Sequence, residues 1–182
     1  MASINPFASY ERSNNPSTNK EKYVFFWKLE QDNGFLSQWH NSPFIYEGKG
    51  FTTAEQFMMY KKAEFFKDYV MAEAILTFGE RHPATHREMG RLVVGFDELM
   101  WMNESPMIVR VGNLCKFTQN TELKKMLLDT GDKLIVEASA YDRIWGIGFN
   151  KDSAIGNENK WGSNKLGMAL MDVRKVIKEQ YS

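Results

Sequence analysis

A carboxylate and an amine lie seven residues apart in the segment 53–63, at Glu55 and Lys62. On a helix, which turns by about 100° per residue, this spacing points both side chains in nearly the same direction, two turns apart. Met58 and Met59 share that side, so Lys62 would lie on an apolar face. An ammonium there is costly unless it is paired or used. The chemistry open to such a pair is proton transfer by the acid and nucleophilic attack by the amine.

A structural interpretation accounts for the same residues. Thr52-Thr53-Ala54-Glu55 has the form of a capping box, in which Glu55 would bond to the first free amide of the helix. Lys62 would then lay its stem over the core and keep its ammonium in water. Spacing alone leaves both interpretations open.

A second cluster contains Glu137 and Asp142, five residues apart around a short bend, followed by Arg143 and Trp145. On a strand that leads into a turn, the two carboxylates could face one cavity, and the small residues at 138–140 would leave room for a ligand. The alternative is a solvated turn with an Asp–Arg surface pair, which contributes little stability.

Composition excludes several classes of protein. The 182 residues predict one domain with a sizeable core. The 23 basic and 23 acidic residues form no block of like charge, which argues against a general nucleic-acid or membrane-surface binder but not against a pocket for one nucleotide. Cys115 is the only cysteine, so no intrachain disulfide is possible. We find no secretion signal and no apolar run of membrane-spanning length, and we therefore expect a cytoplasmic or nuclear protein.

Other motifs predict no cofactor or metal. Gly146-x-Gly148 is not followed by a third glycine that opens a helix, and the chain has no phosphate-binding loop. His82 and His86 have the spacing of two metal ligands on one helix face, but Pro83 disturbs the first turn and no third ligand is near in sequence. We therefore predict no metal site.

The elements that must position these residues are predicted from periodicity and turn signals. Residues 1–21 are expected to be a flexible leader, and 22–182 the folded domain. The expected strands and helices, in chain order, are strand 23–28, a turn at Asn33-Gly34, short partner strand 44–46, helices 53–67, 69–78, 83–91, 97–102, 105–117 and 121–130, strand 133–138, and helix 166–178. This order predicts an α+β class, mainly helical, with a small β-sheet.

From about Tyr23 to the C-terminus, the chain resembles the YbiA-like, or NADAR, family, whose name refers to a proposed link to NAD and ADP-ribose. The matching motifs are Gly34-x-Leu36-Ser37-Gln38-Trp39, Thr53-Ala54-Glu55-Gln56-Phe57-Met58-Met59 with Lys62-Ala63, Gly90-Arg91, Phe96-Asp97, Trp101, Gly112-Asn113-Leu114-x-Lys116-Phe117-x-Gln119-Asn120, Leu127-Leu128-x-Thr130-Gly131, Glu137-Ala138-Ser139, Asp142-x-x-Trp145-Gly146-Ile147-Gly148 and Trp161-Gly162-x-Asn164-x-Leu166-Gly167. One departure is Ala140, where the family pattern has proline, so the bend before Asp142 is less constrained.

The resemblance implies a YbiA-like fold and an N-glycosidase that cleaves the bond between C1′ of a phosphorylated ribose and a nitrogen. The expected substrates are small-molecule N-ribosides, namely early pyrimidine intermediates of riboflavin synthesis, or ADP-ribosyl groups on guanine, including those on nucleic acid. No cofactor, metal or membrane is implied.

The resemblance also implies roles for individual residues. Lys62 would attack C1′ and form a Schiff base, Glu55 would move protons or orient the sugar, and Asp142 or Glu137 would act as acid or hold ribose hydroxyls. The expected substrate-binding residues are Trp39 and Trp145 for the base, Arg91 and Lys116 for phosphate, Asn113 and Asn164 for sugar hydroxyls, and Ser37 and Gly146 in the pocket.

Three alternatives remain open at this point. The reaction could use two carboxylates and water without a lysine adduct. The chain could be a module that binds ADP-ribose or a nucleotide without cutting it, although intact Glu55, Lys62, Glu137 and Asp142 argue against a lapsed enzyme. It could also be a structural partner protein, which the balanced charge and the lack of a long apolar seam do not favour.

Overall fold

The computed structural model describes residues 22–77 and 82–181. The predicted leader 1–21 and the end of the helix predicted over 69–78 lie outside the described residues. The elements in chain order are β1 (Tyr23–Phe26), η1 (Gly34–Leu36), β2 (Phe44–Tyr46), β3 (Lys49–Phe51), α2 (Ala54–Phe65), α3 (Tyr69–Thr77), α4 (Pro83–Arg91), α5 (Glu98–Gln119), α6 (Thr121–Asp129), β4 (Leu134–Glu137), α7 (Lys151–Ala154), η2 (Glu158–Lys160) and α8 (Lys165–Tyr181). The predicted class, α+β and mainly helical, is confirmed.

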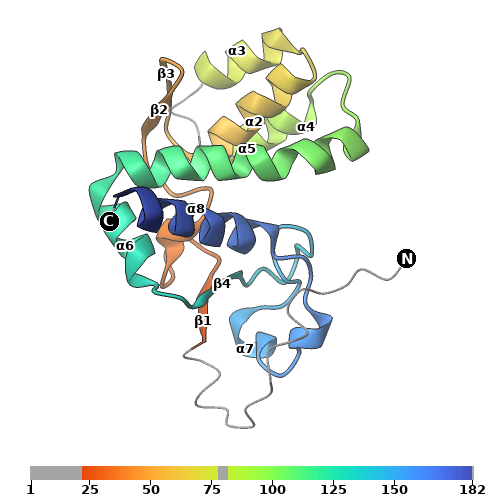
Figure 1. The fold of residues 1–182 in the computed structure, drawn as a ribbon. Helices are drawn as coiled ribbons and strands as arrows, with labels where there is room; N and C mark the ends of the chain where they lie inside the picture. The colour runs from red at the N-terminus through yellow and green to blue at the C-terminus, as the bar shows by residue number, and fades with distance from the viewer. Residues whose placement is uncertain (1–21, 78–81, 182) are drawn as a thin grey trace.

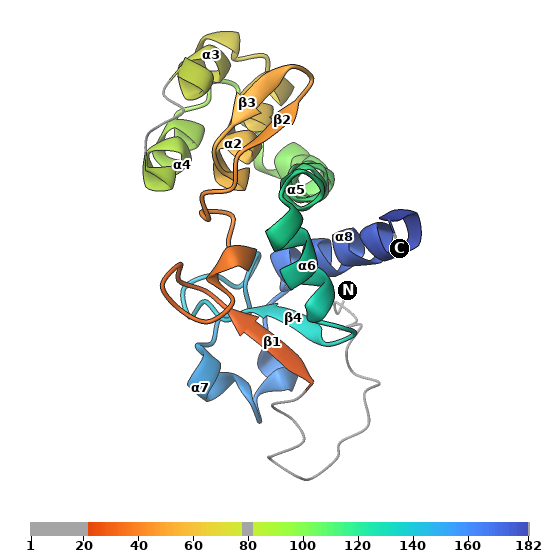
Figure 2. The ribbon, with the colours of Figure 1, turned by 90° about the vertical axis from the view of Figure 1, so that its left-hand side faces the viewer.

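The long helix α5 runs between two groups of elements (Figure 1). Helices α2, α3 and α4 lie on one side of it with the β2–β3 hairpin, whereas β1, β4, α7 and α8 lie on the other (Figure 2). The chain passes from one group to the other through the segment that contains η1. Any site between the groups must therefore draw on segments that are far apart in sequence.

The strands form two pairs and not one sheet. β1 and β4 are parallel, with Phe26 opposite Glu137 at their carboxyl ends. β2 and β3 form an antiparallel hairpin, whose turn residues Glu47 and Gly48 both have positive φ, as a tight two-residue hairpin turn requires. The strand predicted over 44–46 thus exists, but it pairs with Lys49–Phe51 and not with the first strand. The predicted partner was wrong because hairpin closure is local and β1 finds its partner in β4.

Helix α5 is continuous where the sequence predicted two helices, over 97–102 and 105–117. Pro106 lies inside it and not in a first turn. A proline at this position removes one helical hydrogen bond. Trp101 before it and Ile108 and Val109 after it are buried in the same core, so tertiary packing maintains the helix across the proline.

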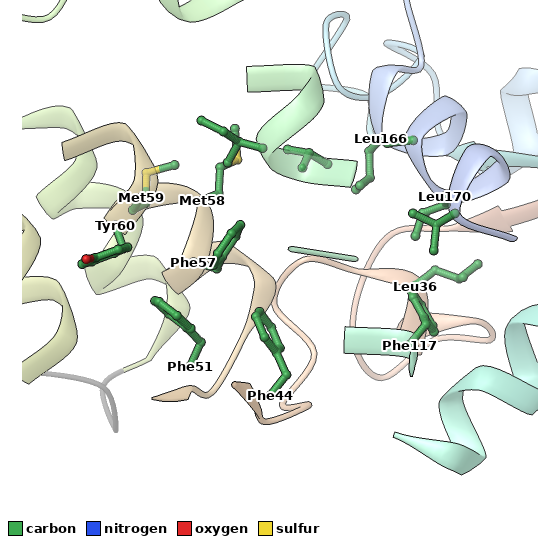
Figure 3. Packing of buried hydrophobic residues seen from close by; sticks show 14 of the residues in the cluster. Leu36, Phe44, Phe51, Phe57, Met58, Met59, Tyr60, Phe117, Leu166 and Leu170 are labelled. Carbon is green, nitrogen blue, oxygen red and sulfur yellow. The ribbon is translucent and has the colours of Figure 1, made fainter. Parts of the chain in front are cut away.

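The main core joins the two groups. Phe57 of α2 packs edge-to-face on Phe51 and Phe44 of the hairpin. On the other side of α5, Leu36 lies near Phe117, Leu166 and Leu170, where η1, α5 and α8 meet (Figure 3). As predicted, Leu166, Leu170, Val173 and Ile177 form the buried side of α8. This packing fixes α2 and the η1 segment, which both contribute to the site described next.

Candidate active site

A cavity of about 790 Å³ lies between α2 and α4 on one side and the segments that follow β1 and β4 on the other. We call its two sides the helical wall and the loop wall. The helical wall consists of Glu55, Met58, Met59, Lys62, His82, Arg87, Gly90, Arg91 and Trp101. The loop wall consists of residues 27–30, Glu137, Ser139, Tyr141, Asp142 and Trp145. Ser37, Gln38 and Trp39 join the two walls, and Leu166 of α8 adds an apolar surface.

The first turn of α2 determines what Glu55 can do. Thr53 is the N-cap, and its hydroxyl accepts a hydrogen bond from the backbone N–H of Gln56 at 3.1 Å. The side chain of Gln56 reaches back and accepts from the backbone N–H of Thr52 at 2.8 Å. The reciprocal half of the cap thus comes from Gln56. The capping-box interpretation of Glu55 was therefore wrong by one residue, and its carboxyl is left facing the cavity.

Glu55 is a buried carboxyl, with 7% of the residue exposed. Burial raises its pKa to about 7, because the charged form loses solvation. The positive charge of Arg87 and a hydrogen bond from the side chain of Trp39 act in the opposite direction and limit the rise. Glu55 is consequently able to both give and take a proton near neutral pH.

Lys62 is buried on the cavity side of α2, with 8% exposed. Its Nζ donates to the carbonyl oxygen of Gly90 at 2.8 Å and lies 4.0 Å from the centre of the Phe96 ring. Burial, and then the charge of Arg91, lower the pKa of the amine. The alternative in which the ammonium stays in water is contradicted. A larger share of neutral, nucleophilic amine is the chemical consequence.

Glu137 ends β4 and presents a carboxyl to the loop wall. Its Oε2 is buried and has no hydrogen-bond partner among the described residues. Burial, followed by the charges of Asp142 and Glu55, raises its pKa to about 8. The charges of Glu55 and Asp142 both raise the pKa of Glu137 because the three carboxyls surround the same cavity. With this pKa the carboxyl of Glu137 is largely protonated at neutral pH, a state that can donate a proton.

Asp142 is fixed by the bend that it initiates. Its Oδ1 accepts from the backbone N–H groups of Ile144 at 2.7 Å and Trp145 at 2.8 Å. The guanidinium of Arg143 donates to the carbonyl of Lys160 at 2.7 Å, so the predicted Asp–Arg surface pair is not what orders this bend. Backbone hydrogen bonds therefore hold Oδ1 in place, and the Asp142 side chain also lines the cavity.

A second segment, residues 162–166, also holds the bend in place. Residues 162–166 donate backbone hydrogen bonds to residues 143–147, including Asn164 N–H to the carbonyl of Gly146 at 3.2 Å and Leu166 N–H to that of Trp145 at 3.1 Å. A Cβ on Gly146 would lie 2.9 Å from the carbonyl oxygen of Glu137 and 3.0 Å from that of Asp142. Gly146 therefore permits the close approach of the two acidic segments and does not itself line the cavity, contrary to its predicted place in the pocket.

Three further predicted binding residues do not line the cavity. Lys116 is fully buried, and its ammonium donates to two backbone carbonyls, which leaves it no access to a phosphate. Asn113 donates to the side chain of Gln38 at 2.7 Å. Asn164 accepts from the backbone N–H of Glu137 and donates to the carbonyl of Ile135. Both asparagines satisfy polar groups of the surrounding structure. The other predicted residues do line the cavity: Ser37, Trp39, Glu55, Lys62, Arg91, Glu137, Asp142 and Trp145.

Comparison with known proteins shows the family to which the chain belongs. The model of the NADAR domain matches residues 25–178. The chain belongs to the NADAR family. It is 39% identical over 165 residues to N-glycosidase R617 of Acanthamoeba polyphaga mimivirus, with 85% of this chain and 96% of that protein covered. It is 28% identical to the riboflavin biosynthesis protein VVA0006 of Vibrio vulnificus, over 95% of this chain and 44% of that protein.

The NADAR fold is confirmed by a solved structure. The NMR structure of the E. coli protein YbiA superposes with a TM-score of 0.71 at 26% identity, with 89% of each chain covered. The family resemblance and the YbiA-like fold expected from the sequence are thus correct, and so is the expected class of enzyme, the N-glycosyl hydrolases. Within the described residues, no helix is both long and apolar enough to cross a membrane.

The NADAR site contains residues that sequence reasoning missed. Arg87 lies four residues before Arg91 on the predicted helix 83–91, a spacing that puts both on one face and could have revealed it. Its guanidinium lies 5.4 Å from the centre of the Trp39 ring. The ring centres of Trp27 and Tyr141 lie 6.1 Å apart on the loop wall, and only the tertiary fold brings these two side chains together. His82 caps α4 by accepting from the N–H of Ala84, and the described residues contain no metal-binding cluster.

Proposed function

We propose that this chain hydrolyses the C1′–N bond of a phosphorylated ribose, either in ADP-ribosylated guanine or in a phosphoribosyl pyrimidine of the riboflavin pathway. The observation that carries the proposal is the meeting of one amine with a lowered pKa and two carboxyls with raised pKa values in one cavity. The names of the relatives, an N-glycosidase and a riboflavin biosynthesis protein, support the reaction and one of the two substrates.

Glu137 is the proposed general acid. The bond from C1′ to the base breaks more easily when the leaving nitrogen receives a proton. A carboxyl with a pKa of about 8 carries that proton at neutral pH. Its Oε2 is buried and has no partner within residues 22–77 and 82–181, so it can donate this proton to a bound base.

Lys62 is the proposed nucleophile. Its neutral amine attacks C1′ as the C1′–N bond breaks, and one of its protons passes to Glu55. Glu55 returns this proton to the ring oxygen as the bond from C1′ to that oxygen breaks, which opens the sugar and gives a protonated Schiff base between C1′ and Nζ. Water adds to C1′, the C1′–Nζ bond breaks, and the free sugar and the amine are regenerated. The hydrogen bond to Gly90 can persist in the neutral amine, which orients the lone pair for attack.

The remaining residues have proposed roles in binding. Asp142, fixed by two backbone N–H groups, has an oxygen to spare for a ribose hydroxyl. Trp39 and Trp145 offer aromatic surfaces for a flat base. Arg87 and Arg91 supply positive charge for phosphate. In the alternative reaction, Glu55 would activate water against C1′ and Lys62 would only stabilise charge.

Mass spectrometry of the protein incubated with a substrate panel tests the proposal. The panel holds phosphoribosyl pyrimidines, NAD, ADP-ribose and guanine-ADP-ribosylated DNA, each with and without borohydride. We expect release of a free base from one member, and a reduced sugar adduct on Lys62. Cleavage without an adduct would favour the two-carboxylate reaction. Absence of cleavage from folded protein, with binding retained, would support a non-catalytic binding module.

The neighbouring lysine is the matched control for the adduct. Lys61 adjoins Lys62 in sequence but pairs with Glu64 at 2.7 Å and does not line the cavity. Lys61→Met should retain both cleavage and the adduct, whereas Lys62→Met should lose both. An adduct on Lys61, or on several lysines equally, would indicate non-specific reaction with a free sugar.

A further inference from the structure

Lys116 is a buried lysine that none of the proposed chemical steps uses, and burial lowers its pKa to about 7. It lies on α5, is fully buried, and donates to the carbonyl oxygens of Phe35 at 2.7 Å and Ser37 at 2.9 Å. Buried ammonium groups are normally paired with a carboxylate. Here both hydrogen-bond acceptors belong to one short backbone segment, at η1.

That segment leads directly to Glu55. The carbonyl of Gln38 accepts from the backbone N–H of Glu55 at 3.0 Å, and the side chain of Trp39 donates to the Glu55 carboxylate. Asn113, one turn before Lys116 on α5, holds the side chain of Gln38 at 2.7 Å. A chain of direct contacts thus connects α5, through residues 35–39, to the acid at the start of α2.

We propose that Lys116 is a positioning residue for the cavity, which sets the indole of Trp39 against the carboxyl of Glu55 by fixing residues 35–39. Without its ammonium, two buried carbonyls would lose their donors, and the segment would move to find others. Asn113 holds the same segment through a side chain instead of the backbone, and is the weaker of the two tethers. For its effect on turnover, the inference rests on the proposed glycosidase function; for its effect on Trp39 and Glu55, it does not.

The electrostatic consequence has a definite sign. The Trp39 hydrogen bond lowers the pKa of Glu55 relative to what burial alone would give. Loss of this bond therefore raises that pKa above the value of about 7 in the parent protein. The other charged or titratable groups that line the cavity keep their identity in every variant used below: Lys28, Glu30, Lys62, His82, Arg87, Arg91, Glu137, Tyr141 and Asp142. His40, next to Trp39, has a pKa lowered by burial and by the charge of Lys116, so Lys116→Met raises that pKa as well. Asn113→Ala keeps Lys116, and a shift in that variant therefore cannot come from loss of the Lys116 charge.

The first test follows the indole N–H signal of Trp39 by ¹H–¹⁵N NMR across pH 5 to 9, assigned with Trp39→Phe. In the parent we expect the signal to titrate with a midpoint near that of Glu55, about 7. In Lys116→Met the midpoint should move to higher pH, or the signal should stop following Glu55. Unchanged titration in a folded Lys116→Met protein would overturn the inference.

Two other variants keep the test decisive. Arg174→Met removes another buried cation, which donates to Thr130 at 2.7 Å and does not line the cavity. It should lower stability yet leave the indole titration unchanged. Asn113→Ala releases the weaker tether and should move the titration in the same direction by less. If Lys116→Met does not fold, an unmoved titration in Asn113→Ala overturns the inference by itself.

Turnover supplies the second readout. If the parent cleaves an N-riboside, Lys116→Met should lower kcat by on the order of 10- to 100-fold, as a displaced catalytic group does, with a smaller change in KM. The limb of the pH profile that belongs to Glu55 should move to higher pH. A moved indole signal with no cleavage by any protein would reject the proposed function and keep the positioning role. If the parent cleaves the substrate but Lys116→Met leaves both the indole signal and the pH profile unmoved, the proposed function stands and the positioning role is rejected.

Discussion

The helical wall and the loop wall of the cavity carry opposite charges and are built by different means. The helical wall presents three cations, Lys62, Arg87 and Arg91, with one acid, Glu55. The loop wall presents three acids, Glu30, Glu137 and Asp142, with one cation, Lys28. A phosphorylated riboside that lies between them would meet cations at its phosphate and proton donors at its leaving base.

The two walls also differ in what holds them. In the helical wall, side-chain directions follow from helix geometry, and α2 is fixed by aromatic packing behind it, as with Phe57 and Tyr60 on Phe51. In the loop wall, acids are held by backbone hydrogen bonds and by glycines that have no room for a Cβ. We therefore expect the helical wall to tolerate most changes on its cavity side, except at Gly90, where an added Cβ would lie 2.0 Å from the Met59 sulfur. We expect the loop wall to be sensitive to a single added methyl group at Gly146.

The largest effect is expected at the amine of the helical wall. Lys62→Met retains the apolar stem and removes the ammonium, so the protein should fold. Turnover should fall by at least about 10³-fold, because a covalent step loses its nucleophile. Steady-state rates with the substrate found in the panel, compared with Lys61→Met, measure this. Activity of Lys62→Met within tenfold of the parent would exclude the Schiff base.

The next effect separates chemistry from capping within one helical turn. Glu55→Gln should be at least as resistant to urea as the parent at neutral pH, because it removes the cost of ionising a buried carboxyl, and it should lose on the order of 100-fold in kcat, a typical contribution of proton transfer. Gln56→Ala should behave in the opposite way. It removes the acceptor for Thr52 N–H and the donor to the carbonyl of Ile75 and should cost about 1 to 3 kcal/mol of stability. Full activity in Glu55→Gln would return Glu55 to a structural role.

The helical wall was largely predictable from sequence. Periodicity is local, so the shared face of Glu55, Met58, Met59 and Lys62 follows from spacing alone, and the structure confirms it. The cap was assigned to Glu55 instead of Gln56 because both side chains are long enough to accept a hydrogen bond from a backbone N–H at the start of the helix. Because Thr53 is the N-cap, the third residue of the helix is Gln56, the position from which a side chain completes the capping box.

The loop wall was predictable only in part. The spacing of Glu137 and Asp142 around a bend indicated that both could face one cavity, and the resemblance pointed to the same residues. Their convergence, however, depends on the parallel pairing of β1 with β4 and on contacts from residues 162–166. Asn113, Lys116 and Asn164 have the side chains of ligand-binding residues and were assigned as such. Only the tertiary structure reveals that buried backbone groups occupy them, since no local pattern encodes those partners.

A glycine exchange tests the sensitivity of the loop wall. Gly146→Ala brings a Cβ within 2.9 Å and 3.0 Å of two carbonyl oxygens, so the segments of Glu137 and Asp142 must separate. We expect a loss of about 1 to 3 kcal/mol in the free energy of unfolding and a clear fall in kcat. Gly50→Ala is the control, because no atom lies within 4 Å of its added Cβ; it should change stability by less than about 0.5 kcal/mol. Equal behaviour of the two variants would contradict the claim that close packing at Gly146 holds the acids of the loop wall in place.

The last comparison concerns the pH dependence of stability and sets one acid of the loop wall against a surface acid. Glu137 has a pKa of about 8 in the folded protein against 4.5 as its ordinary value. Between these values the unfolded chain releases the proton and the folded protein keeps it, so the free energy of unfolding falls as pH rises, by up to about 1.4 kcal/mol per pH unit. Glu137→Gln removes this contribution. Its stability relative to the parent should therefore increase from pH 5 to pH 8 and level off above, as measured by urea unfolding at each pH. Exposed Glu73→Gln should remain parallel to the parent throughout. A Glu137→Gln curve that also stayed parallel would mean that the carboxyl of Glu137 ionises as freely in the folded protein as in water, and the loop wall would then lack its proton donor.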